Sequence, residues 1–161
     1  MLTEAQIAKV WSDMLAAEAR SYYFGDLAAR YVKVKQWITG ISFFLSSGAA
    51  ATIVGKAPSW VPISLSIVVA AASAYAMAIN LDGNISTMAK LQLAWHRIMV
   101  EYERLWNHPD APDAEDKLMR IIQMEEDPSE QATTSAPNDQ KLLAKWQKRV
   151  FALRGLTDKH A

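Results

Sequence analysis

Residues 37–81 decide the fold, and they read WITGISFFLSSGAAATIVGKAPSWVPISLSIVVAAASAYAMAINL. This stretch holds two runs without Asp, Glu, Lys, Arg or His, at 37–55 and 60–81, joined by a short loop that contains Lys56. A helix rises about 1.5 Å per residue, so each run is long enough to cross roughly 30 Å of hydrocarbon. The pattern predicts an all-α protein built on a two-helix transmembrane hairpin.

The overall composition hides this signal. The 161 residues are 51% hydrophobic and 21% charged with zero net charge, as in many soluble proteins, but Lys56 is the only charge within 37–81. The absence of net basicity argues against a nucleic-acid partner, and the absence of cysteine excludes disulfides and thiolate metal sites. A soluble hairpin inside an all-α core is the alternative, since the first run is rich in glycine and hydroxyl groups.

The flanking charges predict the orientation of the hairpin. Lys and Arg gather on both outer sides of the two runs, whereas the loop holds only Lys56. This bias favours both termini in the cytoplasm and the loop outside. The apolar core of the first run begins too far from the N-terminus for a cleavable signal peptide. Trp37 and Trp60 begin the two runs, so we expect them to be interfacial anchors.

Amphipathic helices are predicted outside the hairpin. A capping box formed by Thr3 and Gln6 begins the first helix, and apolar stripes of period 3.6 mark helices at 3–35 and 84–107. These two helices are expected to pack together through Trp11, Trp95, Tyr102 and Trp106. The predicted organisation is a cytoplasmic helix at 1–36, the hairpin at 37–81, a helical region at 82–126, a flexible linker at 127–138 and a basic amphipathic helix at 139–161.

Polar and small residues follow regular spacings within the two apolar runs. Ser66, Ser73 and Asn80 recur every seven residues, and Thr39, Ser42 and Ser46 share one helical face. Small residues recur at spacing four, a pattern that allows helices to approach closely in lipid. In the first run they are Ser47, Ala51 and Gly55, and in the second they are Ala70, Ala74 and Ala78, which follow Ser66. Such groups turn away from lipid, so they either pack helices together or line a water-filled path in an oligomer.

No chemistry-bearing constellation emerges from the rest of the chain. His96, Glu101 and His108 lack the spacing of metal ligands, and no phosphate loop or nucleophile motif is present. An acidic segment at 110–130 suggests a solvated face, and the basic segment at 141–159 suggests a helix attracted to anionic lipid headgroups or to the acidic face. We therefore expect a protein that is not an enzyme and takes no cofactor.

The layout resembles the SLATT family, the two-helix membrane effectors of bacterial nucleotide-signalling conflict systems. Three features carry the resemblance: Arg20-Ser21-Tyr22-Tyr23 in the first helix, Arg30-Tyr31-Val32-Lys33 before the hairpin, and the segment 94–105, AWHRIMVEYERL, after it. The resemblance covers roughly residues 5–125. It implies an oligomeric, pore-forming or membrane-disrupting effector of the bacterial inner membrane in antiviral defence, triggered through an associated sensor or nucleotide-signalling protein.

Other functions remain open at the level of sequence. One is a non-pore membrane anchor or adaptor whose cytoplasmic helices recruit a partner. A holin-like protein is another, although the large charged part fits it less well. A soluble helical module is the fallback. Since one hairpin cannot enclose a channel, the pore hypothesis requires a homo-oligomer in the lipid bilayer.

Overall fold

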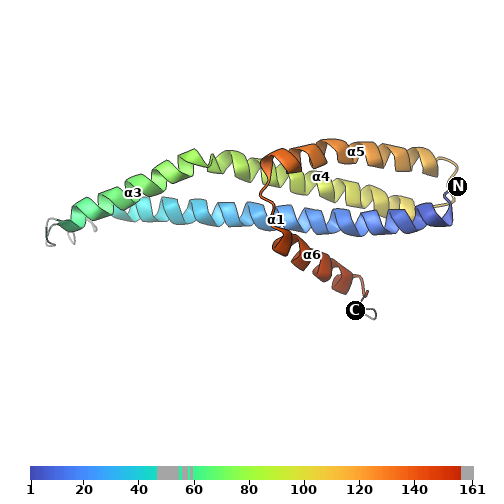
Figure 1. The fold of residues 1–161 in the computed structure, drawn as a ribbon, viewed down its shortest axis with the longest axis horizontal. Helices are drawn as coiled ribbons and strands as arrows, with labels where there is room; N and C mark the ends of the chain where they lie inside the picture. The colour runs from blue at the N-terminus through green and yellow to red at the C-terminus, as the bar shows by residue number, and fades with distance from the viewer. Residues whose placement is uncertain (47–54, 56–57, 59, 157–161) are drawn as a thin grey trace. The chain divides into compact units, whose positions relative to one another are not determined.

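The computed structural model describes residues 1–46, 55, 58 and 60–156. Over these residues the protein is all-α, with five helices and no strand (Figure 1). The helices are α1 (Glu4–Ser46), α3 (Trp60–Ala78), α4 (Leu81–Asn107), α5 (Ala114–Ser135) and α6 (Gln140–Leu153). They form two compact units: unit 1 comprises residues 1–27 and 87–161, and unit 2 comprises residues 28–86.

The start of α1 follows the predicted capping box. The backbone N–H of Thr3 donates to Oε1 of Gln6 at 2.7 Å, and the backbone N–H of Gln6 donates to Oγ1 of Thr3 at 3.3 Å. Both bonds satisfy N–H groups that lack an intrahelical partner at a helix start. The helix then continues without a break to Ser46 and contributes residues to both units.

The core of unit 1 is the seam between α1 and α4. Residues on the apolar stripes of both helices are almost fully buried: Val10, Met14, Met88, Leu91, Trp95, Ile98 and Tyr102. The Oγ of Ser21 adds a hydrogen bond to the carbonyl of Gln92, 3.3 Å away. The expected packing of the first and post-hairpin helices is therefore confirmed within unit 1, and burial of these large side chains stabilises it.

Helix α5 corrects the predicted linker. The sequence suggests a flexible segment at 127–138, but the helix continues through Pro128 and ends only at Ser135. A proline inside a helix costs about 3 kcal/mol, so the packing must offset that cost. Pro128 is itself buried, and it extends the inward stripe of Leu118 and Ile121 at heptad-like spacing. Burial of this stripe against the other helices of unit 1 overrides the local signal for a loop.

Helix α6 packs onto unit 1 through polar and aromatic contacts. Asp139 caps its N-terminus by accepting a hydrogen bond from the N–H of Leu142 at 3.0 Å, and Gly155 ends it with a φ of 72°. The Trp146 ring stacks on Tyr22 with centroids 5.2 Å apart. Near its end, Arg154 donates to Glu18 and Glu103 at 3.0 Å each. The last helix is therefore held by the rest of unit 1.

Unit 2 is an antiparallel pair of helical segments. Phe44 near the end of α1 lies with Leu65 in one groove, whereas Thr39 lies with Ala76 and Asn80 in another. Lys35 and Asp82 close the pair with an ion pair of 2.6 Å. These contacts define a two-helix hairpin, and two helices alone offer little interior in which to bury side chains.

Among the described residues, no single helix has both the length and the apolar composition of a membrane span. One bent pair, Ile63–Ala78 followed by Leu81–Asn107, passes that test jointly, with a bend of 42°.

Candidate membrane-facing site

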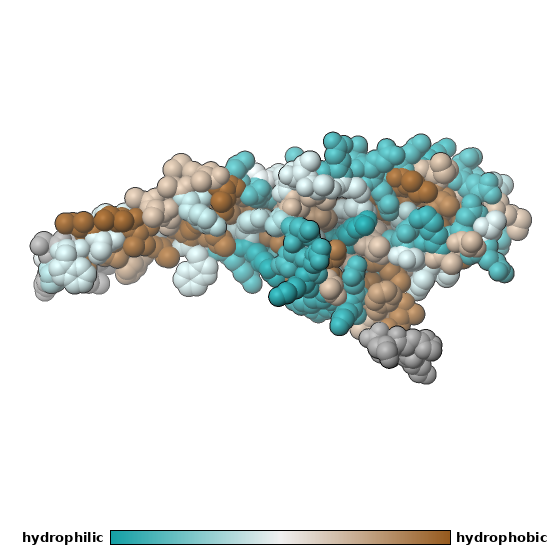
Figure 2. Space-filling view, in the orientation of Figure 1, coloured by the Kyte–Doolittle hydropathy of each residue, from teal (hydrophilic) through white to brown (hydrophobic). Residues whose placement is uncertain are grey.

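Unit 2 leaves many large apolar side chains exposed. Figure 2 shows brown, apolar atoms gathered along α3. Large hydrophobic residues are exposed on both helices of the hairpin: Trp37, Ile41, Phe43, Phe44, Trp60, Ile63, Ile67, Val68, Tyr75 and Met77. So many exposed large apolar residues on two helices are unusual for a soluble monomer and are typical of contact with lipid or another protein. We therefore take this surface as the candidate functional site.

The two predicted anchors lie on this surface. Trp37 is 73% exposed and Trp60 is 68% exposed, whereas Trp95 in unit 1 is 1% exposed. A tryptophan ring combines a large apolar face with one N–H donor, which suits the boundary between water and hydrocarbon. Their exposure fits that role, and the role itself stays a prediction.

The small residues of α3 lie on the side turned away from α1. The residues facing α1 are partly covered and recur at alternating spacings of three and four: Leu65, Val69, Ala72 and Ala76. Ala70, Ala74 and Ala78 are exposed, as is Ser66. At about 100° per residue the three alanines lie on the opposite face of the helix, whereas Ser66 lies at its flank. The three alanines do not hold the hairpin together, so they remain available to another helix.

The predicted polar residues are divided between two places. Ser66 is exposed and Ser73 is partly covered, both at the flank of α3. Thr39 and Asn80 line one groove of about 380 Å³ between the hairpin helices, and Ser42 is partly covered on α1. Ser47 and Ala51 lie outside the described residues, as does the side chain of Ser46, while Gly55 lies in a turn. The structure thus brings Thr39 and Asn80 together.

Asn80 has a backbone role that its spacing does not reveal. Its φ of 44° breaks the helix between α3 and α4, in the left-handed region that asparagine tolerates better than most residues. A Cβ at Gly83 would collide with the Asn80 amide, so this glycine provides the space for that side chain. Nδ2 of Asn84 then donates to the carbonyl of Ile79 at 2.7 Å. The break between the two helices therefore lies at Asn80.

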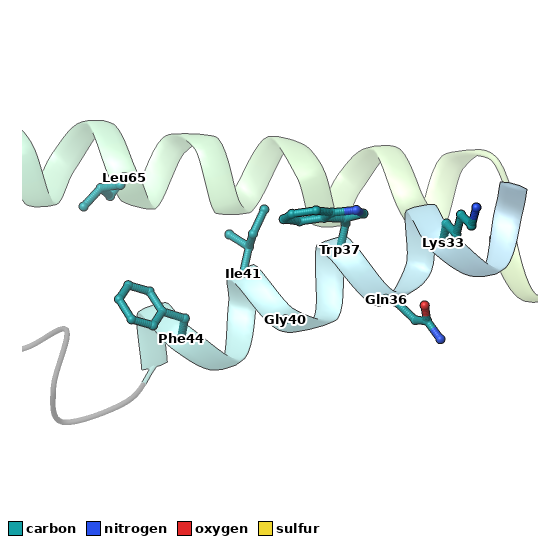
Figure 3. A pocket seen from close by; sticks show the side chains of 7 residues that line it. All are labelled: Lys33, Gln36, Trp37, Gly40, Ile41, Phe44 and Leu65. Carbon is teal, nitrogen blue, oxygen red and sulfur yellow. The ribbon is translucent and has the colours of Figure 1, made fainter.

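An apolar groove opens between α1 and α3 on the same surface. It has a volume of about 540 Å³ and is lined by Lys33, Gln36, Trp37, Gly40, Ile41, Phe44 and Leu65. Figure 3 shows Trp37 and Ile41 directed from α1 toward α3, and Leu65 reaching from α3 into the same space. Gly40 leaves a gap in the α1 surface, because a Cβ there would meet nothing within 4 Å.

Unit 1 contains a polar group that sequence reasoning placed in solvent. Glu125 belongs to the predicted acidic face, but it is only partly exposed on the inward stripe of α5. Burial raises the pKa of the Glu125 carboxyl. The Tyr102 hydroxyl and the charge of Arg20 lower this pKa, but by less than burial raises it. Burial also raises the pKa of Tyr102, and the negative charge of Glu125 adds to that rise. The sequence does contain a signal for this partial burial, because Ile121, Glu125 and Pro128 are spaced to lie on one helical stripe.

The other aromatic residues predicted in unit 1 lie in its interior or at its edge. Trp95 and Tyr102 are buried, and the guanidinium of Arg20 lies 4.4 Å from the Trp95 ring centroid. The rings of Trp11 and Trp106 contact each other with centroids 4.9 Å apart. Cation–π and ring contacts of this kind add to the area buried between α1 and α4.

The basic helix at the C-terminal end is only partly available to a charged partner. Lys141, Lys145 and Lys148 are exposed, whereas Arg154 is committed to Glu18 and Glu103. These carboxylates raise the pKa of the Arg154 guanidinium further above its usual value. Within the part of the chain that the structure describes, no group of three His, Asp or Glu side chains is placed to hold a metal ion.

Comparison with known proteins adds no relative. No family model matches the chain, and no curated protein or solved structure is significantly similar to it. The SLATT resemblance therefore remains a prediction that rests on the residues quoted for it.

Proposed function

We propose that this chain is an oligomeric membrane effector whose hairpin of α1 and α3 inserts into the bacterial inner membrane and permeabilises it. The observation that carries the proposal is the exposed apolar surface of unit 2. About 25 cal/mol is gained per Å² of apolar surface removed from water, so lipid is a favourable environment for this hairpin. Unit 1 and both termini lie in the cytoplasm in this proposal, following the flanking positive charges.

The exposed small residues support association between copies. Ala70, Ala74 and Ala78 turn away from α1, and small side chains at this spacing let helix backbones approach closely in lipid. In an oligomer, helices of neighbouring copies meet along this face. The flank that carries Ser66 and Ser73 then borders the interface and supplies polar groups to a water-filled path.

The proposed trigger comes from another protein. By its resemblance to the SLATT family, the chain acts in a bacterial conflict system in which an associated protein senses a nucleotide signal. No part of the sequence suggests a nucleotide-binding motif of its own. Genes for a nucleotidyltransferase or nuclease beside this one would support the proposal.

A non-pore anchor that recruits a cytoplasmic partner is the second candidate. The exposed lysines of α6 favour it, because Lys141, Lys145 and Lys148 offer a basic surface in unit 1 to an acidic partner. Dye leakage separates the two candidates, since an anchor leaves vesicles intact.

The deciding experiment measures dye leakage from liposomes that contain the purified chain. The S66L/S73L double variant should assemble normally, as judged by crosslinking. It should cause little dye leakage, because the proposed water-filled path would then be lined by leucine side chains. Ser64→Leu is the matched control, since Ser64 is an exposed serine on another face of α3. Asn80 is left unchanged because its left-handed backbone would confound the result. Equal leakage from the double variant and wild type would contradict a pore lined by these serines.

A further inference from the structure

The groove between α1 and α3 has a shape suited to a single flexible apolar chain. Its walls are the side chains of Trp37, Ile41, Phe44 and Leu65, and Gly40 provides the gap between them. A helix surface normally fills such a position with a side chain, since even a small apolar void loses packing energy. Here a Cβ at Gly40 would meet no atom within 4 Å, so the space beside it is empty.

The groove has the length of one membrane leaflet. Lys33, Trp37, Ile41 and Phe44 follow one another at spacings of four, four and three, and therefore lie along one face of α1. At about 1.5 Å per residue, Lys33 and Phe44 are separated by roughly 16 Å along the helix axis. Half of a hydrocarbon core of about 30 Å is nearly the same length.

The charge at one end of the groove selects the headgroup. Lys33 is exposed at the end that precedes the apolar run, one turn before Trp37. Lys35 lies nearby on α1 but is paired with Asp82 at 2.6 Å, so its charge is partly neutralised. The groove thus presents an ammonium group at the level of the headgroups and an apolar channel at the level of the acyl chains.

We propose that this groove binds an anionic phospholipid of the cytoplasmic leaflet, with its phosphate at Lys33 and one acyl chain along Trp37, Gly40 and Phe44. The proposal rests on the insertion of the hairpin into a bilayer. It adds a specific lipid site, which the proposed effector function does not require. A lipid held there covers the apolar residues on one side of the hairpin and favours membranes rich in acidic lipid.

The test uses the full chain in two sets of phosphatidylcholine vesicles. One set contains a small fraction of brominated phosphatidylglycerol, and the other contains the same fraction of brominated phosphatidylcholine. The signal is the tryptophan fluorescence that is lost in the Trp37→Phe variant, so it reports on the groove. One basic residue near the surface favours an anionic lipid by about fivefold. At the same lipid fraction, brominated phosphatidylglycerol should therefore occupy the groove, and quench Trp37, about five times as effectively as brominated phosphatidylcholine.

Two matched pairs of variants separate this site from bulk lipid. Lys33→Gln should make the two brominated lipids quench Trp37 about equally. Lys35→Gln removes an equal charge and should leave the preference for phosphatidylglycerol unchanged. Gly40→Leu fills the groove and should abolish the preference. Gly40→Ala adds only a methyl group at the same position and should retain most of it, since its Cβ meets no other atom.

The possible failures point to different conclusions. A wild-type chain that does not float with vesicles overturns both the lipid site and the proposed function. A chain that floats but quenches equally with both lipids, or a Lys33→Gln variant that keeps the preference, overturns the lipid site alone. A preference that disappears as the protein-to-lipid ratio rises also overturns it, because a second copy then occupies the groove.

Discussion

The two units of this chain use the same side chains in opposite ways. Unit 1 places Trp95 and Tyr102 inside, where α1, α4 and α5 supply enough neighbours to exclude water. Unit 2 leaves Trp37, Phe43 and Trp60 exposed on two helical segments. Apolar composition alone does not distinguish these outcomes. The number of helices that share an interior decides whether the apolar surface is buried by protein or left for another medium.

The largest expected effect tests the interior of unit 1. Trp95→Ala should lower the free energy of unfolding by about 3–5 kcal/mol, since it removes a buried aromatic ring and leaves a cavity. Urea denaturation in mild detergent, followed by helical circular dichroism, measures this loss. Trp37→Ala is the control and should change stability by less than about 0.5 kcal/mol. Similar losses in the two variants would erase the proposed difference between the units.

The next effect tests the outer surface of unit 2. Ile67→Arg places a charge on the exposed face of α3, which should oppose membrane insertion by about 2.5–3.5 kcal/mol. Leu93→Arg is the matched control, because Leu93 is an exposed leucine on α4 in unit 1. The fraction of protein that resists alkaline carbonate extraction measures insertion. Equal resistance of both variants would mean that unit 2 does not enter lipid.

A smaller effect tests the break between α3 and α4. Asn80→Ala should be less stable than Asn80→Gly by about 1 kcal/mol, because alanine pays the steric cost of the left-handed backbone and glycine does not. Urea titrations of the two variants give the difference. If alanine proves the more stable, the helix is continuous at residue 80 and glycine merely weakens it.

The smallest effect concerns Glu125 and depends on pH. Its folded-state pKa is raised by burial, so its stabilising contribution is complete below the unfolded pKa and is lost as the pH rises through the folded value. Glu125→Gln should therefore be more stable than wild type at pH 7, by less than about 1 kcal/mol because water screens this half-exposed group. The gain should disappear near pH 4. Glu126→Gln, at an exposed neighbour, is the matched control for the loss of one carboxylate and should change stability by less than about 0.5 kcal/mol.

The sequence was a good guide where one periodic signal dominated. The capping box at Thr3 and the stripes that meet at Trp95 and Tyr102 correctly predicted the seam between α1 and α4. It failed at residues 127–135, where Pro128 and several small polar residues imitate a linker. Local propensity cannot account for that helix, because its stability comes from tertiary burial.

The candidate site was predictable in composition but not in geometry. The apolar runs indicated an unusual hairpin, and Trp37 and Trp60 are exposed as expected of interfacial residues. The heptad spacing of Ser66, Ser73 and Asn80 suggested one common stripe, but Asn80 instead adopts the left-handed backbone that ends α3. The groove above Gly40 depends on which face of α1 meets α3, and spacing alone does not specify that face.

Pro128 has a consequence for the motion of unit 1. It has no amide hydrogen, so the carbonyl of Met124 receives no bond from the next turn of α5. The ladder of hydrogen bonds is interrupted there, and the last turns up to Ser135 are held less firmly than the turns around Leu118. Amide protons after Pro128 should therefore exchange with deuterium sooner, through local opening that leaves the first half of α5 intact.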